Sequence, residues 1–281
     1  MTAESQDKET LVFLPTYNER STIDHLLDAI LTLPNRCDVL VIDDNSPDGT
    51  GTLLKTRAAG DTRIKLIFRT ERGGIGSAHR LGWLYARRFG YARIVTLDAD
   101  LSHDPLDIPR LLNELDAGAD VAIGSRFVRG GILDYKGWRH FLSRTANSLA
   151  RMLLRLPIAE YTNSFRAARL DRVPAGLIEA IPNDGYAFFL MATVLLARQG
   201  LRLTEIPIHF YDRHSGASKM PRMEILRGAA NLLYLTFHRR PFEPKASTTV
   251  ASVNCSQCGE PYVVAIRNGA ATCLRCMSVF G

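Results

Sequence analysis

Short apolar runs alternate with amphipathic segments along most of the chain. Each run has the length of a strand, and the segments between them carry apolar residues at helical spacing, as Ile23, Leu26, Leu27 and Ile30 do. Strands that alternate with helices predict an α/β fold, a mostly parallel sheet with helices on both faces. The expected strands lie at residues 10–14, 39–42, 64–68, 94–97, 121–124 and 203–210.

Two longer helices are expected at residues 138–156 and 223–237, and a strongly apolar, buried helix that includes Thr193 is expected at 187–197. The last is too short to span a bilayer. The first carries Arg144, Arg151 and Arg155 along one side. Such a helix either lies on an anionic lipid surface or exposes a solvated basic face above a buried apolar stripe. The helix at 223–237 either packs internally or docks on a membrane or a membrane-anchored partner.

Two carboxylates, Asp98 and Asp100, follow the apolar run at 94–97. Side chains two positions apart on an extended strand point to the same side, and ligands of open α/β sheets bind at the carboxyl ends of the strands. A divalent cation would relieve the repulsion between the pair and could hold a diphosphate. The alternative is a strand end followed by a helix cap, with Asp100 or Ser102 capping a helix that opens at Pro105.

Two polar loops could contact phosphate. The glycine-rich turn at residues 72–76 fits neither a dinucleotide-binding fingerprint nor a P-loop. It is read as a tight turn into a helix that lets the backbone approach a ligand. The loop at 211–219 carries Arg213, His214 and Lys219 and is either a cationic clamp that closes over a diphosphate or a mobile surface loop.

Net charge, the first ten residues and the cysteines indicate the kind of partner and the location of the protein. The 281 residues carry a formal charge of +6, which favours anionic partners such as phosphates, nucleotides, nucleic acid or an acidic membrane surface. Residues 1–10 are polar and mixed in charge and do not resemble a secretory signal. Four of the five cysteines cluster near residue 281 while Cys37 stands alone, which is no disulfide framework, so a cytosolic location is expected.

The clustered cysteines form two C-x2-C pairs separated by fourteen residues, at Cys255, Cys258, Cys273 and Cys276. Four thiolates in this arrangement predict a closed structural zinc site with no position for catalysis. Asn268-Gly269 between the pairs predicts a hairpin turn. The expected organisation is therefore a main domain at 1–240, a linker at 241–253 and a zinc ribbon at 254–281. The ribbon could bind nucleic acid or a protein, or serve as a folded cap.

Seven short motifs occur in an order that resembles glycosyltransferase family 2, and within it the polyprenyl-phosphate mannose synthases. The resemblance covers about residues 10–240 and leaves the zinc ribbon outside. The motifs are PTYNE at 15–19, DDNSPDGT at 43–50, GIG at 74–76, DADLSH at 98–103, GSR at 124–126, TNSFR at 162–166 and R-x2-G-x-SK at 213–219.

The resemblance implies a GT-A, Rossmann-like fold and an inverting transfer of mannose from GDP-mannose to a polyprenyl or dolichyl phosphate at the cytoplasmic membrane face. The implied partners are the nucleotide sugar, the lipid phosphate and a membrane surface or a membrane-anchored partner. Nucleic acid is not an expected partner. The resemblance implies that the donor is bound by Pro15, Tyr17, Glu19 and Asp44, and that Mg²⁺ or Mn²⁺ is coordinated by Asp98, Asp100 and Ser102. It also implies that Arg213 and Lys219 close over the diphosphate. The acceptor phosphate would be bound by Arg126 and Arg139.

The chain departs from the family pattern at three positions. Glu160 stands where Asp is common, and Phe189 and Met191 stand where the family usually has Gln and Glu. The last two changes predict a more apolar pocket and leave the sugar open. Alternatives to mannosyl transfer are therefore transfer of glucose or another sugar to a lipid or other acceptor, or a non-catalytic scaffold that acts through the zinc ribbon.

Overall fold

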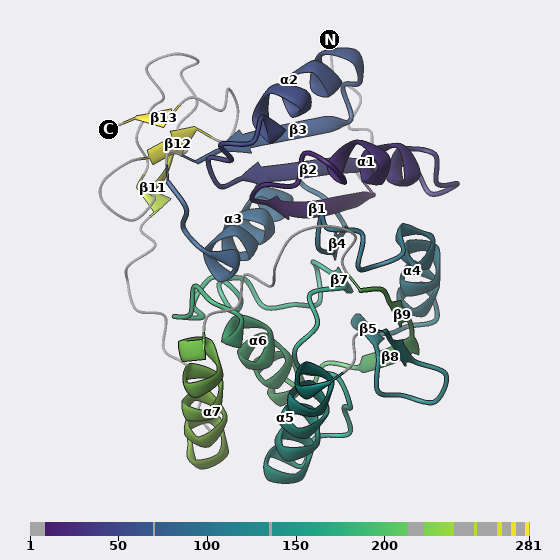
Figure 1. Cartoon of the computed structure of the whole chain (residues 1–281), viewed down its shortest axis with the longest axis vertical. Helices are drawn as coiled ribbons and strands as arrows, with labels where there is room; N and C mark the ends of the chain where they lie inside the picture. Colours follow the sequence, from purple (N-terminus) through teal and green to yellow (C-terminus); the bar gives the residue numbers. More distant parts are fainter. Residues whose placement is uncertain are drawn as a thin grey trace.

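The protein is built around a seven-stranded sheet with the strand order β3-β2-β1-β4-β7-β5-β8 (Figure 1). The computed structural model describes residues 9–69, 71–134, 137–212, 222–238, 250–251, 263–265, 271–273 and 279–280. The strands of the large sheet are β1 (Thr10–Thr16), β2 (Cys37–Asp43), β3 (Ile64–Phe68), β4 (Arg93–Thr96), β5 (Val121–Ser125), β7 (Arg166–Arg169) and β8 (Leu203–Pro207).

The parallel pairing predicted from the sequence is confirmed, with one exception. Strands β3, β2, β1 and β4 pair in parallel, as do β5 and β8, whereas β7 is antiparallel to both of its neighbours, β4 and β5. The segment Arg166–Arg169 is short and has arginine at both ends, so it lacks the apolar run that marks the other strands. Because β7 is reversed, its first residues lie at the edge where β4 and β5 end.

Helices cover both faces of the sheet, as the alternating pattern predicted. On β1, Leu11 and Phe13 pack into one hydrophobic cluster with α3 and α6, and Val12 and Leu14 pack into another with α1 and α4. This alternation follows from the period of two along a strand. The helices are α1 (Ile23–Leu31), α2 (Thr50–Gly60), α3 (Ile75–Arg88), η1 (Pro105–Asp107), α4 (Ile108–Asp116), α5 (Trp138–Leu154), α6 (Ala187–Arg198) and α7 (Arg222–Phe237).

Helix α6 is buried on almost every side, which confirms the buried helix expected at 187–197. Helix α7 packs against α6 and α5, and both α5 and α7 project away from the sheet (Figure 1). Both carry large apolar side chains exposed to solvent, so their apolar residues are only partly used for internal packing. Among the described helices, none is both long and apolar enough to cross a lipid bilayer.

The single strand expected at 203–210 is instead two strands. Strand β8 ends at Pro207, and β9 (His209–Phe210) pairs in parallel with β6 (Ile132–Leu133) in a separate two-stranded sheet. Proline has no amide hydrogen to donate to a ladder, which accounts for the break. The first long helix ends at Leu154, two residues before the expected end, because Arg155 adopts a left-handed conformation.

The C-terminal region contributes a four-stranded antiparallel sheet of β10 (Val250–Ala251), β11 (Val263–Ala265), β12 (Ala271–Cys273) and β13 (Val279–Phe280). Strands β11 and β12 pair antiparallel, as the predicted hairpin requires, and the predicted turn at Asn268-Gly269 lies outside the described residues. Cys273 is the last residue of β12, and Cys255, Cys258 and Cys276 lie outside the described residues. The zinc prediction therefore stays a prediction.

Candidate active site

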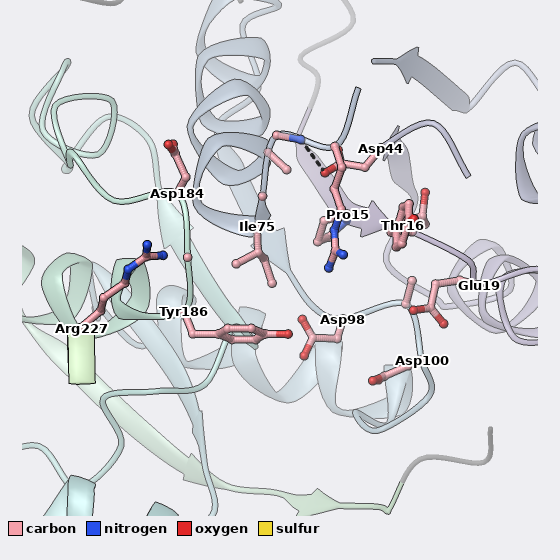
Figure 2. A pocket seen from close by; sticks show the side chains of 17 residues that line it. Pro15, Thr16, Glu19, Asp44, Ile75, Asp98, Asp100, Asp184, Tyr186 and Arg227 are labelled. Atoms are coloured by element: carbon pink, nitrogen blue, oxygen red, sulfur yellow. Dashed lines mark hydrogen bonds between the residues drawn. The ribbon is translucent and has the colours of Figure 1, made fainter. Parts of the chain in front are cut away.

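A cavity of about 480 Å³ opens at the carboxyl ends of β1, β2 and β4 (Figure 2). The N-terminus of α3, the segment before α6 and one residue of α7 complete its walls. Six of the donor-site residues expected from the sequence line it: Pro15, Tyr17, Glu19, Asp44, Asp98 and Asp100. Its other lining residues are Thr16, Arg72, Gly73, Gly74, Ile75, Ala78, Ala99, Asp184, Gly185, Tyr186 and Arg227.

Asp98 and Asp100 reach the cavity from the loop that follows β4, and both carboxylates are oriented by serine hydroxyls. Ser164 Oγ donates to Asp98 Oδ1 at 2.8 Å. Ser102 Oγ donates to Asp100 Oδ1 at 2.5 Å, and the Ser102 amide donates to the same oxygen at 3.1 Å. Ser102 itself is fully buried. Its hydroxyl orients Asp100, and coordination of a metal by Ser102 itself stays a prediction.

The backbone of this loop is fixed from two sides. Thr22, at the start of α1, donates from Oγ1 to the Ala99 carbonyl at 2.8 Å. On the other side, His103 Nδ1 accepts from the Asp98 amide at 3.2 Å, and His103 Nε2 lies 2.6 Å from Asn163 Oδ1. Both contacts are satisfied by a neutral imidazole with its proton assigned to Nε2. The loop is thereby held to α1 and to the segment before β7.

The helix cap expected at this loop is made by a different residue. Asp104 accepts from the Leu106 amide at 2.9 Å and caps η1, where Pro105 is the first residue. Asp100 and Ser102 are therefore not the cap, because their side chains bond to each other. The expectation that one of these two residues caps the helix was wrong, and Asp100 remains directed into the cavity (Figure 2).

The donor set suits a hard divalent cation that arrives with a phosphate ligand. Mg²⁺ is commonly bound by one or two carboxylates together with substrate phosphates. Asp98 and Asp100 supply two such carboxylates in one cavity. Within the part of the chain that the structure describes, no group of three or more His, Cys, Asp or Glu side chains forms a complete metal site. Two carboxylates suit a cation that takes further ligands from the phosphates of a substrate.

One end of the cavity carries an aromatic ring and a cation. The Arg72 guanidinium carbon lies 4.4 Å above the centroid of the Tyr17 ring, a cation–π contact. The Glu19 amide donates to Thr50 Oγ1 at 3.1 Å, which fixes the PTYNE segment against α2. A planar base or a ribose could be held here by stacking and by the Glu19 carboxylate.

Asp44 forms a buried ion pair with Arg69 at the same end of the cavity. The Gly73 amide also donates to Asp44 Oδ2 at 3.2 Å (Figure 2). Burial raises the pKa of the Asp44 carboxyl, and the Arg69 guanidinium and the glycine amides oppose that shift. The hydrogen bond from Gly73 joins the end of β2 to the glycine turn, so Asp44 shapes the wall at the Tyr17 end of the cavity.

The glycine turn is shaped mainly by protein packing. A Cβ on Gly74 would lie 2.5 Å from the Asp184 carbonyl oxygen, and one on Gly76 would collide with the Asn183 carbonyl. Gly74 also has a φ of 86°, which favours glycine. The close backbone approach expected here is thus to the segment 183–184. Gly73 and Gly74 still line the cavity.

Arg126 lies outside the cavity lining and is engaged in a buried ion pair. Its Nε and one terminal nitrogen each donate to Glu160 at 2.7 Å, and the same terminal nitrogen donates to Thr162 Oγ1 at 2.8 Å. Burial opposes ionisation of Glu160, but the Arg126 charge and its hydrogen bonds outweigh burial and lower the pKa of Glu160. The structure therefore does not bring Arg126 together with the donor-site residues.

Phe189 and Met191 do not make the cavity more apolar, contrary to the expectation from the family pattern. Both lie on α6 with exposed fractions of 2% and 1%, inside the hydrophobic core. Phe189 packs edge-on against His79, and the Arg166 guanidinium carbon lies 5.6 Å from its ring centroid. These substitutions therefore change the core behind the site.

Several expected residues cannot be placed. Arg213 and Lys219 lie outside the described residues, and Arg139 is on α5 with a side chain that the structure does not describe. Conversely, Tyr186 and Arg227 were not predicted from the sequence, and both line the cavity on the other side of Asp98 from Glu19 (Figure 2). A signal for Arg227 was present, because it is a cation at the start of an otherwise apolar stretch of α7.

Solved structures share this fold. The crystal structure of glucosyl-3-phosphoglycerate synthase from Mycobacterium tuberculosis, in complex with Mn²⁺, uridine diphosphate and glucosyl-3-phosphoglycerate, aligns with a TM-score of 0.57 at 19% identity. The alignment covers 86% of this chain and 83% of that one. The crystal structure of a mycobacterial protein aligns with a TM-score of 0.56 at 18% identity, covering 92% of this chain and 83% of that one. The GT-A-like architecture expected from the motifs is confirmed.

Curated sequences are more closely similar. A polyprenol monophosphomannose synthase of Mycolicibacterium smegmatis is 40% identical over 215 residues, covering 76% of this chain and 81% of that one. An undecaprenyl-phosphate mannosyltransferase of Micrococcus luteus is 39% identical over 211 residues, covering 75% and 86%. The model of the glycosyl transferase family 2 domain matches residues 11–173. This chain therefore belongs to glycosyl transferase family 2.

Proposed function

We propose that this protein is a divalent-metal-dependent, inverting glycosyltransferase that moves mannose from GDP-mannose onto a polyprenyl phosphate. The observation that carries the proposal is the Asp98–Asp100 pair in a cavity at the carboxyl edge of the sheet. The names of the two curated relatives support the sugar and the class of acceptor. A protein of the same fold that binds Mn²⁺ and uridine diphosphate supports a metal and a nucleotide donor.

The donor is proposed to lie along the cavity. Pro15, Tyr17, Glu19 and Asp44 would contact the base and ribose, and the diphosphate would lie beside Asp98 and Asp100. Mg²⁺ or Mn²⁺ on these two carboxylates, supported by Ser102 behind Asp100, would offset the charge of the departing diphosphate. Arg213 and Lys219, which precede α7 in the sequence, are proposed from the family resemblance to add positive charge at the diphosphate.

The transfer needs positioning more than a general base. An oxygen of the acceptor phosphate, already an anion at neutral pH, would form a bond to the anomeric carbon while the bond from that carbon to the nucleoside diphosphate breaks. The electron pair of the broken bond leaves with the diphosphate, and the displacement inverts the configuration of the sugar. No proton has to be removed, so the protein contributes orientation and charge balance.

Arg139 and Arg126 are both proposed to contact the acceptor phosphate, but only Arg126 would first have to give up an ion pair that the structure shows. Arg139 lies on α5, which projects from the domain (Figure 1). Arg126 would have to exchange Glu160 for the acceptor, because its guanidinium is already paired. Replacing Arg126 should therefore affect the fold as well as the acceptor.

We further propose that the enzyme works at the cytoplasmic face of a membrane. Helix α5 exposes Phe141 and Met152 and contains no acidic residue. Apolar side chains among arginines suit an anionic lipid surface.

Sedimentation with anionic vesicles tests this proposal, with neutral vesicles for comparison. Replacing Arg144 and Arg151 by Glu should reduce binding, the control Arg172→Glu should not, and equal binding by all variants would refute the proposal.

A donor panel tests the main proposal. The protein is incubated with a polyprenyl phosphate and labelled GDP-mannose, UDP-glucose or other nucleotide sugars, with and without a chelator. Transfer from GDP-mannose that the chelator abolishes is expected. Transfer from UDP-glucose alone would favour a glucosyltransferase. Nucleotide binding without any transfer would favour a non-catalytic scaffold.

The cysteine pairs are proposed to hold one zinc ion that stabilises the C-terminal module. The spacing of the pairs and the position of Cys273 at the end of β12, in an antiparallel hairpin, support this. Metal analysis of the purified chain should give about one zinc per molecule, and Cys273→Ser should lower that content. A metal-free wild-type chain would contradict the proposal. Removing residues 241–281 should leave transfer intact.

A further inference from the structure

Basic side chains line the cavity at two distinct places, and only the place beside Tyr17 belongs to the proposed site for the base and ribose. Among the described residues, the basic side chains that line it are Arg72 and Arg227. Arg72 lies over the Tyr17 ring at the nucleotide end. Arg227 reaches the cavity from α7, near Asp184 and Tyr186, on the other side of Asp98 from Glu19 (Figure 2). A donor whose base lies near Tyr17 directs its sugar toward the Arg227 end.

Arg227 also lies beside a stripe of α7 that is apolar and exposed. Leu226, Leu233 and Phe237 recur at helical spacing on α7 and have exposed fractions of 63%, 53% and 78%. Tyr234 lies two helical turns after Arg227 on the same side of α7, and it is 41% exposed. Leu232 and Leu235, by contrast, are buried against the core. One surface of α7 thus joins a cation in the cavity to an exposed apolar stripe.

This arrangement matches a ligand with an anionic head and an apolar chain. We propose that Arg227 binds the phosphate of the acceptor, and that the stripe Leu226–Leu233–Phe237 contacts the adjoining part of its hydrocarbon chain. The inference rests on the proposed function and adds a subsite to it. Arg126 is less suited to the head group because it does not line the cavity. Arginine binds phosphate through a planar pair of donors, so the residue type fits the role.

Steady-state kinetics with wild type, Arg227→Gln and Arg227→Lys tests the head-group contact. The Gln variant should raise KM for polyprenyl phosphate about tenfold or more, with KM for the nucleotide sugar within about twofold of wild type, and Lys should recover part of the loss. The control is Arg172→Gln, an exposed arginine outside the cavity. An unchanged acceptor KM, or an equal rise in the donor KM, would overturn the assignment.

A binding measurement separates this inference from the proposed function. Farnesyl phosphate, which has the same head group on a short chain, is titrated into wild type and Arg227→Gln without a donor. Weaker binding by the variant supports the subsite even if no transfer is found. Binding that is equal in both refutes it even if the wild type is an active transferase. Inorganic phosphate serves as a second probe: if it competes as well as farnesyl phosphate, the site binds free phosphate and the lipid assignment fails.

The apolar stripe has its own test. Replacing Leu233 and Phe237 together by Ser should raise KM for a long-chain acceptor several-fold more than KM for farnesyl phosphate, because only the longer chain extends along α7. Leu106→Ser is the matched control, since Leu106 is 66% exposed on η1 and does not line the cavity. An equal effect on the two acceptors would show that the stripe does not contact the chain.

Discussion

The hydroxyl of Ser164 donates a 2.8 Å hydrogen bond to Oδ1 of Asp98, a residue 66 positions earlier in the chain. The two meet because β7 is antiparallel to β4, so the segment that enters β7 lies beside the loop that leaves β4. The same segment contributes Asn163, whose Oδ1 contacts His103. The TNSFR motif thus supports the carboxylates of the DADLSH motif without lining the cavity itself.

Ser164→Ala should weaken binding of Mn²⁺ in the presence of nucleoside diphosphate by about tenfold, because residues that orient a ligand carboxylate affect metal affinity on this scale. Titration of Mn²⁺ followed by electron paramagnetic resonance measures this directly. Ser148→Ala, at an exposed position of α5, is the control. Unchanged affinity in the Ser164 variant would mean that the hydrogen bond has no part in orienting Asp98.

Asp100→Asn should lower turnover by about a hundredfold or more while the protein stays folded. The amide retains an oxygen that can accept from Ser102, but it removes the negative charge that a divalent cation requires. Asp100→Ala should abolish turnover in the same way. Circular dichroism checks the fold, and Asp171→Asn, an exposed carboxylate, is the comparison. Full turnover in the Asp100 variants would place the metal elsewhere.

Glu160→Gln should destabilise the protein by about 3–5 kcal/mol at pH 7, because it leaves the buried Arg126 charge without its partner. Asp171→Asn breaks an exposed pair with Arg169 and should cost less than about 1 kcal/mol. Urea unfolding measures both. Since the pKa of Glu160 is lowered in the fold, its contribution is present at neutral pH and is lost as pH falls through that lowered pKa. A loss as small as that of the exposed pair would contradict this account.

His79 should make the fold sensitive to mild acid. Its ring is 1% exposed among Phe13, Phe188 and Phe189, and burial, with a smaller effect of Arg166, lowers its pKa from 6.5 to about 3. Between these pH values the unfolded chain binds a proton that the folded chain excludes. Stability should therefore decrease by about 1.4 kcal/mol for each pH unit below 6.5.

The comparison that tests this is unfolding at pH 7 and pH 5 in His79→Leu, which should lose about 2 kcal/mol less than wild type over that interval. His25→Gln, at an exposed position of α1, should behave as wild type does. The same pH dependence in the His79 variant would assign the acid sensitivity to other groups.

The fold was predictable where one physical signal dominated. Buried parallel strands are continuous apolar runs, so β1, β2, β3 and β5 were located within a few residues. Strand β7 was missed because Arg166–Arg169 takes its place in the sheet through backbone pairing with both neighbours rather than through an apolar pattern. The break at Pro207 was visible in the sequence but was not used.

The site residues that could be predicted from the sequence were those at the end of a strand or directly after it. Residues next to strand ends, such as Asp44, Asp98 and Asp100, could be assigned to one edge because parallel strands end together. Tyr186 and Arg227 come from segments whose position depends on how α6 and α7 pack, and spacing along the chain does not encode that. Arg126 was assigned from its motif, and only the structure shows that Glu160 accepts its hydrogen bonds.

The reversed direction of β7 also has a consequence for how this chain can vary. The turn that follows β7, at Leu170 and Asp171, lies beside the start of β4, at the end of the strands away from the cavity. The segment that precedes β7 supplies Asn163 and Ser164. Residues inserted after Asp171 would lengthen a distant connection and leave the reaction centre intact. A single residue inserted before Arg166 would shift both supporting side chains and disconnect them from the carboxylate loop.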